Sequence, residues 1–309
     1  MGQHGPVVWL GFTGLVIALL IIDLGVLNRR SHVLTLKEAA SWSLGLVAFA
    51  LAFGGFLWWR EGSQHALEYY TGYLIELSLS VDNLFVFILI FSYFGVPAEA
   101  QPKVLKWGIL GAIVMRFIMI VVGALLLARF EWIIYVFGGI LILTGVRMLM
   151  QKDERIEPEK NPIVRLARRL LPFSHAYDGT RFLTRTGTGR VLATPLVLVL
   201  LVVEWSDLVF AIDSIPAIFA VTRDPFLVYS SNIFAILGLR ALFFVLAGAM
   251  NRFVYLKTGV AFILVFVGLK MTLSAWIHIP ILLSLAVIIG SLAAAIGLSL
   301  RKAPAPAGA

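Results

Sequence analysis

The sequence predicts an all-α polytopic membrane protein, and three observations support this fold class. Hydrophobic residues make up 60% of the 309 residues and charged residues only 14%, whereas soluble domains are about 45–50% apolar and about 25% charged. Nine hydrophobic segments can be drawn, and most reach the length of about 20 residues that spans a bilayer core. The second half of the chain also repeats features of the first. In lipid a single segment must satisfy its own backbone hydrogen bonds, so we expect each segment to be helical.

The expected membrane helices follow one another from the first residues to the end of the chain. The first is not a cleavable signal peptide, because basic residues follow it rather than precede it. The third and sixth are longer than the bilayer requires, which allows a tilted or a broken helix. The nine segments lie at about 6–27, 38–58, 66–94, 103–127, 132–150, 191–220, 226–249, 253–274 and 279–300.

The distribution of basic residues predicts the orientation of these helices. Lysine and arginine are concentrated in alternate loops and after the last segment, while the other loops hold only Arg60, Arg129 and Arg223. Cytoplasmic loops carry the excess of basic residues, so nine spans place the N-terminus outside and the C-terminus in the cytoplasm. The net charge of +8 therefore reflects topology. It does not indicate a nucleic-acid partner, and the expected surroundings are the lipid bilayer.

The basic loop 151–190 is the one sizeable segment predicted to lie outside the membrane. Asn161-Pro162 is a suitable start for a short helix, with Ile163, Leu166, Leu170 and Leu171 toward the membrane and Arg165, Arg168 and Arg169 toward headgroups. An ordinary solvated connector is the alternative. The Pro/Ala-rich tail 303–309 is expected to be disordered.

Two triplets of segments resemble each other, which predicts an inverted repeat of three helices plus three. Arg116 and Arg240 lie 124 residues apart, and Gly145-Val-Arg147-Met148 recurs as Gly268-Leu-Lys270-Met271. A unit with an odd number of spans must enter the membrane in the opposite direction when repeated. Chance similarity between apolar sequences is the alternative. The predicted organisation is two N-terminal helices (1–65), the first repeat (66–150), the basic loop (151–190), the second repeat (191–274) and a last helix with the tail (275–309).

Two acidic segments lie within the apolar stretches that begin the two repeats. They extend from Glu76 to Asn83 and from Glu204 to Ser214, and they place five carboxylates at membrane depth: Glu76, Asp82, Glu204, Asp207 and Asp213. One charged side chain at the bilayer centre costs about 2.5–3.5 kcal/mol. Such residues need partners, water or an ion, so the segments predict a cation pathway.

The ligand chemistry of these segments favours a hard cation. Carboxylate, hydroxyl, amide and backbone oxygens suit Mn²⁺, Mg²⁺ or Ca²⁺. The chain has no cysteine, and none of its five histidines lies beside the acids, which argues against Zn²⁺ or Cu⁺ and against thiol redox chemistry. On an ideal helix Asp213 points away from the face of Glu204 and Asp207. We expect a helix break at 212–216, caused by Pro216, to turn Asp213 inward.

Pairing with membrane arginines is the structural alternative for the acids, and Arg116 and Arg240 are the candidate partners. Asp23, in the first segment, is either a pathway residue or an interfacial acid. Supporting oxygen donors are expected from four serines near the acids: Ser78, Ser80, Ser206 and Ser214.

At these residues the chain resembles the TerC/Alx family of integral membrane proteins. The resemblance rests on Gly72-Tyr-Leu-Ile-Glu76-Leu-Ser-Leu-Ser-Val-Asp82-Asn83-Leu-Phe, on Phe210-Ala-Ile-Asp213-Ser-Ile-Pro216-Ala and on Asn232-Ile-Phe-Ala-Ile-Leu-Gly-Leu-Arg240, and it extends from Asp23 to Met271. It implies an association with manganese efflux and tellurium resistance, and a transporter superfamily built from inverted three-helix repeats. It also implies metal-binding roles for Glu76, Asp82, Asn83, Glu204, Asp207 and Asp213.

The leading functional hypothesis is an inner-membrane exporter of divalent cations, with Mn²⁺ as substrate and exchange for protons as a further expectation. One alternative is a carrier of oxyanions that uses Arg116 and Arg240. Another is a membrane scaffold in metal or tellurite stress that docks through loop 151–190, with protein partners unspecified. An enzyme is not expected, because no histidine base or nucleophile lies near the acids, and no prosthetic group is expected.

Overall fold

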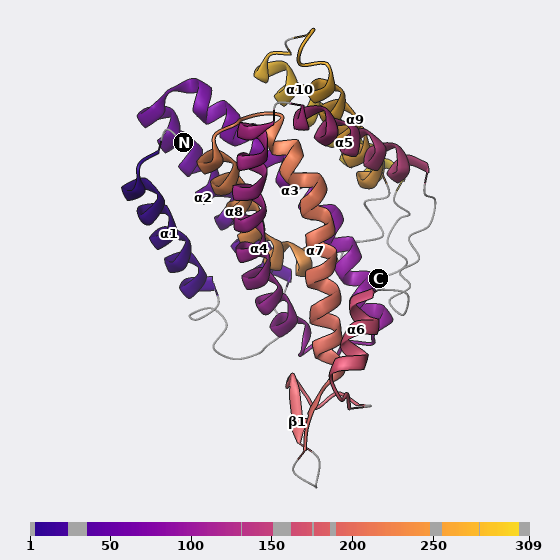
Figure 1. Ribbon diagram of the computed structural model, residues 1–309. Helices are drawn as coiled ribbons and strands as arrows, with labels where there is room; N and C mark the ends of the chain where they lie inside the picture. The colour runs from indigo at the N-terminus through magenta and orange to yellow at the C-terminus, as the bar shows by residue number, and fades with distance from the viewer. Residues whose placement is uncertain are drawn as a thin grey trace.

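The computed structural model describes residues 4–23, 36–130, 132–150, 162–174, 176–185, 190–247, 255–277 and 279–302, without the side chains of Leu36, Asp82, Phe85, Pro162, Arg240 and Lys302. These residues form a bundle of long helices with one small β-hairpin at its lower end (Figure 1). The helices are α1 (Pro6–Ile21), α2 (Leu36–Glu61), α3 (Ser63–Tyr93), α4 (Gln101–Arg129), α5 (Ile133–Met150), α6 (Pro162–Leu170), α7 (Pro195–Phe219), α8 (Pro225–Ala247), α9 (Leu256–Thr272) and α10 (Ile281–Lys302).

Membrane-spanning helices are confirmed. However, among the described residues fewer than the nine expected helices are both long enough and apolar enough to cross a bilayer. Six are long and apolar enough to cross a bilayer, namely α2, α3, α4, α5, α7 and α10. Helix α8 is a seventh if its two parts, bent by 49° between Leu239 and Ala241, form one span. Helix α1 has only 16 residues, which is short of the about 20 that a span needs. The number nine and the orientation therefore stay predictions.

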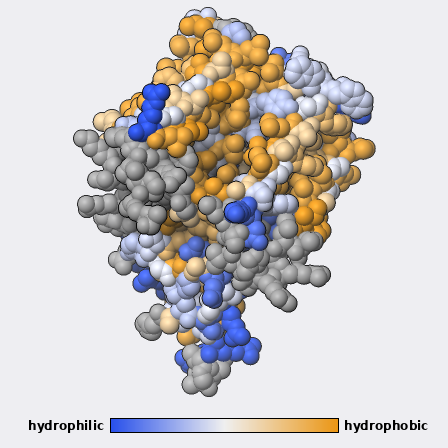
Figure 2. All heavy atoms as spheres, turned by 180° about the vertical axis from the view of Figure 1, so that it is seen from behind, coloured by the Kyte–Doolittle hydropathy of each residue, from blue (hydrophilic) through white to orange (hydrophobic). Residues whose placement is uncertain are grey.

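The surface of the bundle is apolar where lipid would contact it. Seen from behind, Figure 2 shows hydrophobic residues over the upper and middle part and hydrophilic residues gathered at the lower end. Large side chains such as Leu125, Leu143 and Trp59 are more than 60% exposed. An apolar exterior of this extent is costly in water and favourable in hydrocarbon.

Helices α3, α7 and α8 form the centre of the bundle, and α3 is the most enclosed of the candidate spans. Along α3 the side chains of Tyr69, Ile75 and Leu84 are fully buried. Helix α3 packs on α8 and α7, and α7 also packs on α4. Helix α3 is thus held in the interior, while α7 buries one face and exposes Val209 and Ile212 on the other.

Helices α5 and α9 pack against each other through glycine (Figure 1). A Cβ atom on Gly138 would lie 2.9 Å from the carbonyl oxygen of Gly268, and a Cβ on Gly268 would lie 2.7 Å from the carbonyl oxygen of Gly138. About two helical turns further along α5, a Cβ on Gly145 would lie 2.7 Å from the carbonyl oxygen of Ala261. Small residues at such positions let helix backbones approach closely in membranes.

Replacing Gly138 by alanine is expected to destabilise the protein by about 1–3 kcal/mol, because the added methyl group must push backbone apart. The neighbouring Gly139 is the matched control, since its Cβ would meet no atom within 4 Å. Thermal unfolding in a mild detergent should show a lower midpoint for Gly138→Ala and an unchanged or higher midpoint for Gly139→Ala. Equal midpoints would contradict the tight α5–α9 packing.

The loop 151–190 contains more regular structure than expected. The predicted short helix is confirmed as α6, which buries Val164 and Ala167 and exposes Leu166 and Leu170. Strands β1 (Leu183–Arg185) and β2 (Val191–Ala193) pair antiparallel with Leu183 opposite Ala193. This small hairpin is an addition to an all-α membrane architecture. It corrects the start of the sixth segment, because residues 191–193 are strand and the helix begins at Pro195.

Two side chains, Lys103 and Tyr177, fix the hairpin region to the ends of the membrane helices. The Lys103 ammonium donates a hydrogen bond of 2.6 Å to the carbonyl of Thr180 and lies over the Phe182 ring. The Tyr177 hydroxyl donates to the carbonyl of Phe94 at 2.6 Å, and burial raises the pKa of Tyr177 above its ordinary value. These contacts order a connector that hydropathy alone would treat as solvated.

Candidate functional site

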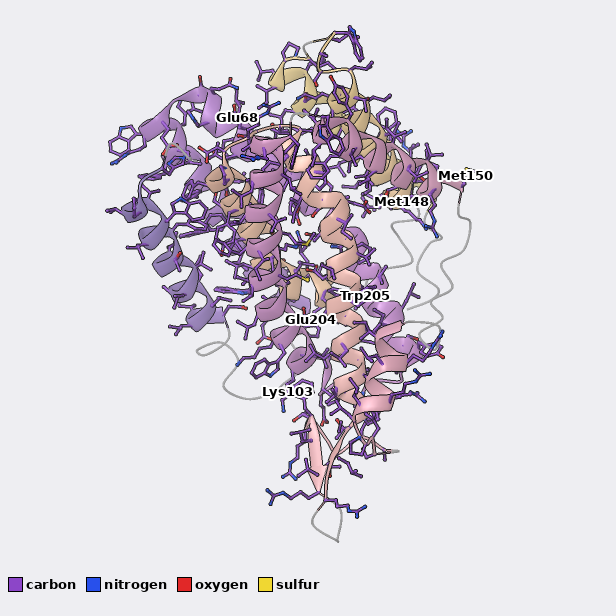
Figure 3. All side chains as sticks on the ribbon, in the orientation of Figure 1. Glu68, Lys103, Met148, Met150, Glu204 and Trp205 are labelled. Carbon is purple, nitrogen blue, oxygen red and sulfur yellow. The ribbon has the colours of Figure 1, made fainter. Side chains whose placement is uncertain are left out.

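The two acidic segments meet in the interior, where α3 and α7 pack on each other and α7 packs on α4. Figure 3 shows Glu204 within α7, between Glu68 toward one end of the bundle and Lys103 toward the other. The site divides into two parts. One surrounds Arg116 of α4, and the other surrounds Asp213 of α7.

Arg116 is fully buried and joins three helices through its guanidinium group. It forms an ion pair with Glu76 of α3, which is also fully buried. It contacts both carboxylate oxygens of Asp207 on α7, from Nη2 at 3.2 Å and from Nε at 3.4 Å. Its Nη1 also donates to the Ser214 hydroxyl at 3.4 Å. A two-point contact between arginine and carboxylate gives both strength and a fixed geometry.

The part around Arg116 holds more acids than bases among the described side chains. Glu76 and Asp207 share one arginine. Glu204, one turn before Asp207, is half-buried with its carboxylate against Gly111 of α4, where a Cβ atom would overlap it. With all three carboxylates ionised this part would carry a net negative charge. Buried charge of this kind is stable only with a proton, a cation or water.

Asp213 lies in a separate part of the site, between α7 and α5. Its Oδ1 accepts a hydrogen bond of 2.9 Å from the Thr144 hydroxyl. The two residues line a cavity of about 140 Å³ together with Asn83 of α3 and Arg147 of α5. The Asn83 amide nitrogen is buried and has no hydrogen-bond partner among the described residues. The cavity is large enough for a water or a small ion and presents oxygen ligands to it.

A very small cavity adjoins Asp207. Its volume is about 20 Å³, and its walls come from α3, α4, α7 and α8. This is roughly the space of a single water molecule. Gly108 and Ala112 of α4 line it, so small residues create the space beside the carboxylate.

The expected break in the second acidic helix is wrong. Helix α7 continues through Pro216 to Phe219, although the proline cannot donate a hydrogen bond to the carbonyl of Ile212. Asp213 does not turn toward Asp207 and instead contacts α5. A helix can tolerate an interior proline when its neighbours hold it in place, and Ser214, Ile215 and Pro216 are all buried by them.

The predicted supporting residues have different surroundings. Ser78 and Ser206 donate to carbonyls of their own helices, those of Leu74 and Val202. Ser214 contacts Arg116, while the buried Ser80 hydroxyl has no hydrogen-bond partner in the described part of the chain. Asp23 is buried and accepts a hydrogen bond of 2.7 Å from the Trp42 indole of α2, which is a structural contact.

Among the side chains that it describes, the structure does not gather the predicted ligands into one metal centre. Over the residues it describes, no three acidic or histidine groups converge in a way that could hold a metal ion. The side chains of Asp82 and Arg240 lie outside the described residues, although their backbones are in α3 and α8. Sequence reasoning missed Thr144 and Gly111, and a polar residue directly before the Gly145-Val-Arg147 motif was the available signal for Thr144.

Comparison with known proteins agrees with the membrane-spanning architecture. The family model described as "Integral membrane protein TerC family" matches residues 61–305. The chain belongs to the TerC family. This assignment confirms the resemblance drawn from the acidic segments, and the protein is an integral multi-pass membrane protein.

Several proteins similar to this TerC family member cover nearly its whole length. An uncharacterised membrane protein of Myxococcus xanthus is 54% identical over 297 residues, covering 96% of this chain and 93% of its own. The "putative membrane-bound redox modulator Alx" of Escherichia coli K12 is 49% identical over 296 residues, covering 93% and 92%. A membrane protein of Rickettsia felis is 41% identical over 281 residues, covering 91% and 93%. No solved structure matches the chain.

Proposed function

We propose that this TerC family protein exports a divalent cation, with Mn²⁺ as the preferred substrate, across the inner membrane. The observation that carries the proposal is the excess of buried or half-buried carboxylates on α3 and α7 over the single arginine that contacts them. Ionisable residues inside a membrane protein most often mark an ion or proton pathway. The oxygen-only ligand set favours Mn²⁺, with Mg²⁺ and Ca²⁺ as alternatives.

The two parts of the site are suited to different tasks. Around Asp213, Asn83 and Thr144 a cavity offers oxygen ligands, and we propose that the cation binds there first. Around Arg116 the acids outnumber the arginine, but the cavity described beside Asp207 is only about 20 Å³, which leaves less room for a cation than the cavity of about 140 Å³ at Asp213. We propose that Glu76, Glu204 and Asp207 carry protons that exchange for the metal.

Reciprocal contacts between α5 and α9 support the inverted repeat that the proposal assumes. A shift of 123 residues, the spacing of Gly145 and Gly268, converts the contact of Gly138 with Gly268 into the contact of Ala261 with Gly145. Both contacts are close backbone approaches. Two antiparallel helices related by a two-fold axis would pack in this way, and transporters with inverted repeats bind substrate where the copies meet.

Everted membrane vesicles test the proposal. Vesicles that contain the wild-type protein should take up Mn²⁺ faster than vesicles without it, and Glu204→Gln or Asp82→Asn should abolish the difference. Glu99→Gln is the control, because Glu99 is an exposed carboxylate between α3 and α4. Uptake that survives both intramembrane substitutions would exclude these residues from the pathway.

A membrane scaffold is the second candidate, favoured by the name of the relatives called redox modulators and by the exposed arginines of α6. It predicts that deletion of residues 162–193 abolishes a metal or tellurite phenotype while Asp82→Asn preserves it. The converse result favours transport. The oxyanion carrier is less well supported, because two carboxylates already engage Arg116.

A further inference from the structure

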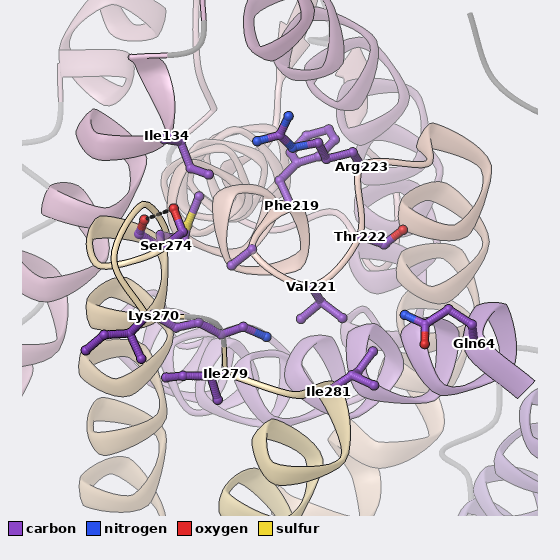
Figure 4. Close-up of a pocket in the computed structure, with 13 residues that line it drawn as sticks. Gln64, Ile134, Phe219, Val221, Thr222, Arg223, Lys270, Ser274, Ile279 and Ile281 are labelled. Carbon is purple, nitrogen blue, oxygen red and sulfur yellow. Dashed lines mark hydrogen bonds between the residues drawn. The ribbon is translucent and has the colours of Figure 1, made fainter.

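A cavity of about 310 Å³ opens at the end of α7 that is remote from the hairpin (Figure 4). The last residues of α7 and α9 line it, together with the first residues of α3, α5 and α10 and the α7–α8 connection. It is separate from the site described above, since neither Arg116 nor any of the predicted metal ligands lines it.

The charged lining of this cavity is entirely positive. Lys270 of α9 and Arg223 of the α7–α8 connection line it, and none of its lining residues is acidic. Figure 4 shows Lys270 and Gln64 extending toward each other from opposite sides. The Lys270 ammonium donates to the Ser284 hydroxyl at 2.9 Å, and neither cation has an ion pair among the described residues. Arg116, by contrast, is held by two carboxylates.

One nearby acid acts on Lys270 from outside the lining. Glu68 lies one turn beyond Gln64 on α3 and attracts the ammonium group electrostatically. Its carboxylate accepts a hydrogen bond of 2.8 Å from the Gln64 amide. Glu68 therefore offsets part of the positive charge of Lys270, although Glu68 itself does not line the cavity. Two cations facing one such acid leave the lining attractive to an anion.

The position of the cavity indicates the depth of lipid headgroups. Helices end or begin around it, and the tryptophans next to its lining, Trp132 and Trp276, are 59% and 76% exposed. Tryptophan is enriched at the level where headgroups meet the apolar core. Ile277, Ile279 and Ile281 form an apolar side of the same cavity. The lining thus combines two cations with apolar side chains.

We propose that this cavity binds a phosphate group between Lys270 and Arg223, supplied by free phosphate or by a phospholipid headgroup. Arginine presents several donors in a planar fork, and lysine acts as a compact charge, so together they suit a tetrahedral oxyanion. The Gln64 amide and the Thr222 hydroxyl also line the cavity and can donate to it. This binding does not depend on the proposed metal transport.

Titration of the purified full-length protein in an uncharged detergent tests the proposal. Three probes are added separately: inorganic phosphate, a short-chain phosphatidylglycerol, and a short-chain diacylglycerol that lacks phosphate. Calorimetry should show binding of at least one phosphate-bearing probe. Lys270→Gln and Arg223→Gln should each weaken it by about tenfold or more, because each removes a charged partner of the oxyanion.

Matched variants make the result specific. Arg185→Gln removes an exposed charge from the hairpin and should leave binding unchanged, while Lys270→Arg should retain it. Binding of inorganic phosphate would indicate a free-anion site, and binding of phosphatidylglycerol alone would indicate a headgroup site. Arg223 is exposed, so its variant should fold even if Lys270→Gln does not. Equal binding of the diacylglycerol, no binding of either phosphate probe, or unchanged binding by Arg223→Gln would overturn the proposal.

Discussion

Replacing Arg116 by glutamine is expected to destabilise the protein by about 3–5 kcal/mol, because it leaves buried carboxylates without their cation. Glu76 and Arg116 are fully buried and Asp207 nearly so, so water cannot replace the lost partner. Thermal unfolding in detergent and the yield of monodisperse protein measure the effect. Arg147→Gln is the control, since Arg147 is also a basic residue of an apolar helix but is exposed.

The double variant Arg116→Gln with Asp207→Asn distinguishes two causes of lower stability, the uncompensated charge and the altered side-chain packing. Neutralising a carboxylate together with the guanidinium removes the uncompensated charge, so the double variant should be more stable than Arg116→Gln alone. Contacting residues show such non-additive effects, whereas distant ones do not. Additive effects, or an Arg116→Gln variant as stable as Arg147→Gln, would mean that Arg116 does not hold the three helices together.

Replacing Asp213 by asparagine is expected to reduce Mn²⁺ flux by about tenfold or more while leaving stability nearly unchanged. Asparagine keeps an oxygen that can accept the Thr144 hydrogen bond, so the local packing is preserved. It removes the negative charge that we propose to attract the cation, and an interaction with a charged group contributes about 1.5–3 kcal/mol. Flux is measured in everted vesicles and stability by thermal unfolding.

Thr144→Val is the companion variant for this prediction. It keeps the shape of the side chain but removes the hydroxyl that binds Asp213, so flux should fall less than in Asp213→Asn. Normal flux in Asp213→Asn would exclude the cavity between α3, α5 and α7 as the cation site. A loss of stability in that variant would instead indicate a structural role for Asp213.

The helices and the location of the acids could be predicted from sequence because both depend on local patterns. Long apolar segments must be helical in lipid, and proline marks the first residues of α6, α7 and α8. The shared face of Glu204 and Asp207 follows from helical periodicity, and both residues face α4 in the structure. The sequence also predicts Arg116 as a candidate partner of the acids.

The contacts between helices could not be predicted in the same way. Periodicity indicates which residues share a face, but not which neighbouring helix that face contacts. Thr144 and Asp213 are 69 residues apart, and no local pattern connects them. The continuous helix at Pro216 depends on packing by its neighbours, and three-residue strands such as β1 and β2 are too short for an alternating pattern to identify.

The proposed function requires that the protein itself transport the cation, with Asp213 binding the metal and Glu76, Glu204 and Asp207 exchanging protons for it. Mn²⁺ flux into proteoliposomes that contain only the purified protein tests it most directly, because no partner protein is present. Wild-type protein should transport Mn²⁺ with a proton movement in the opposite direction, and Glu204→Gln and Asp213→Asn should lose transport while Glu99→Gln keeps it. Proteoliposomes that hold folded wild-type protein yet show no more Mn²⁺ flux than empty liposomes would contradict the claim.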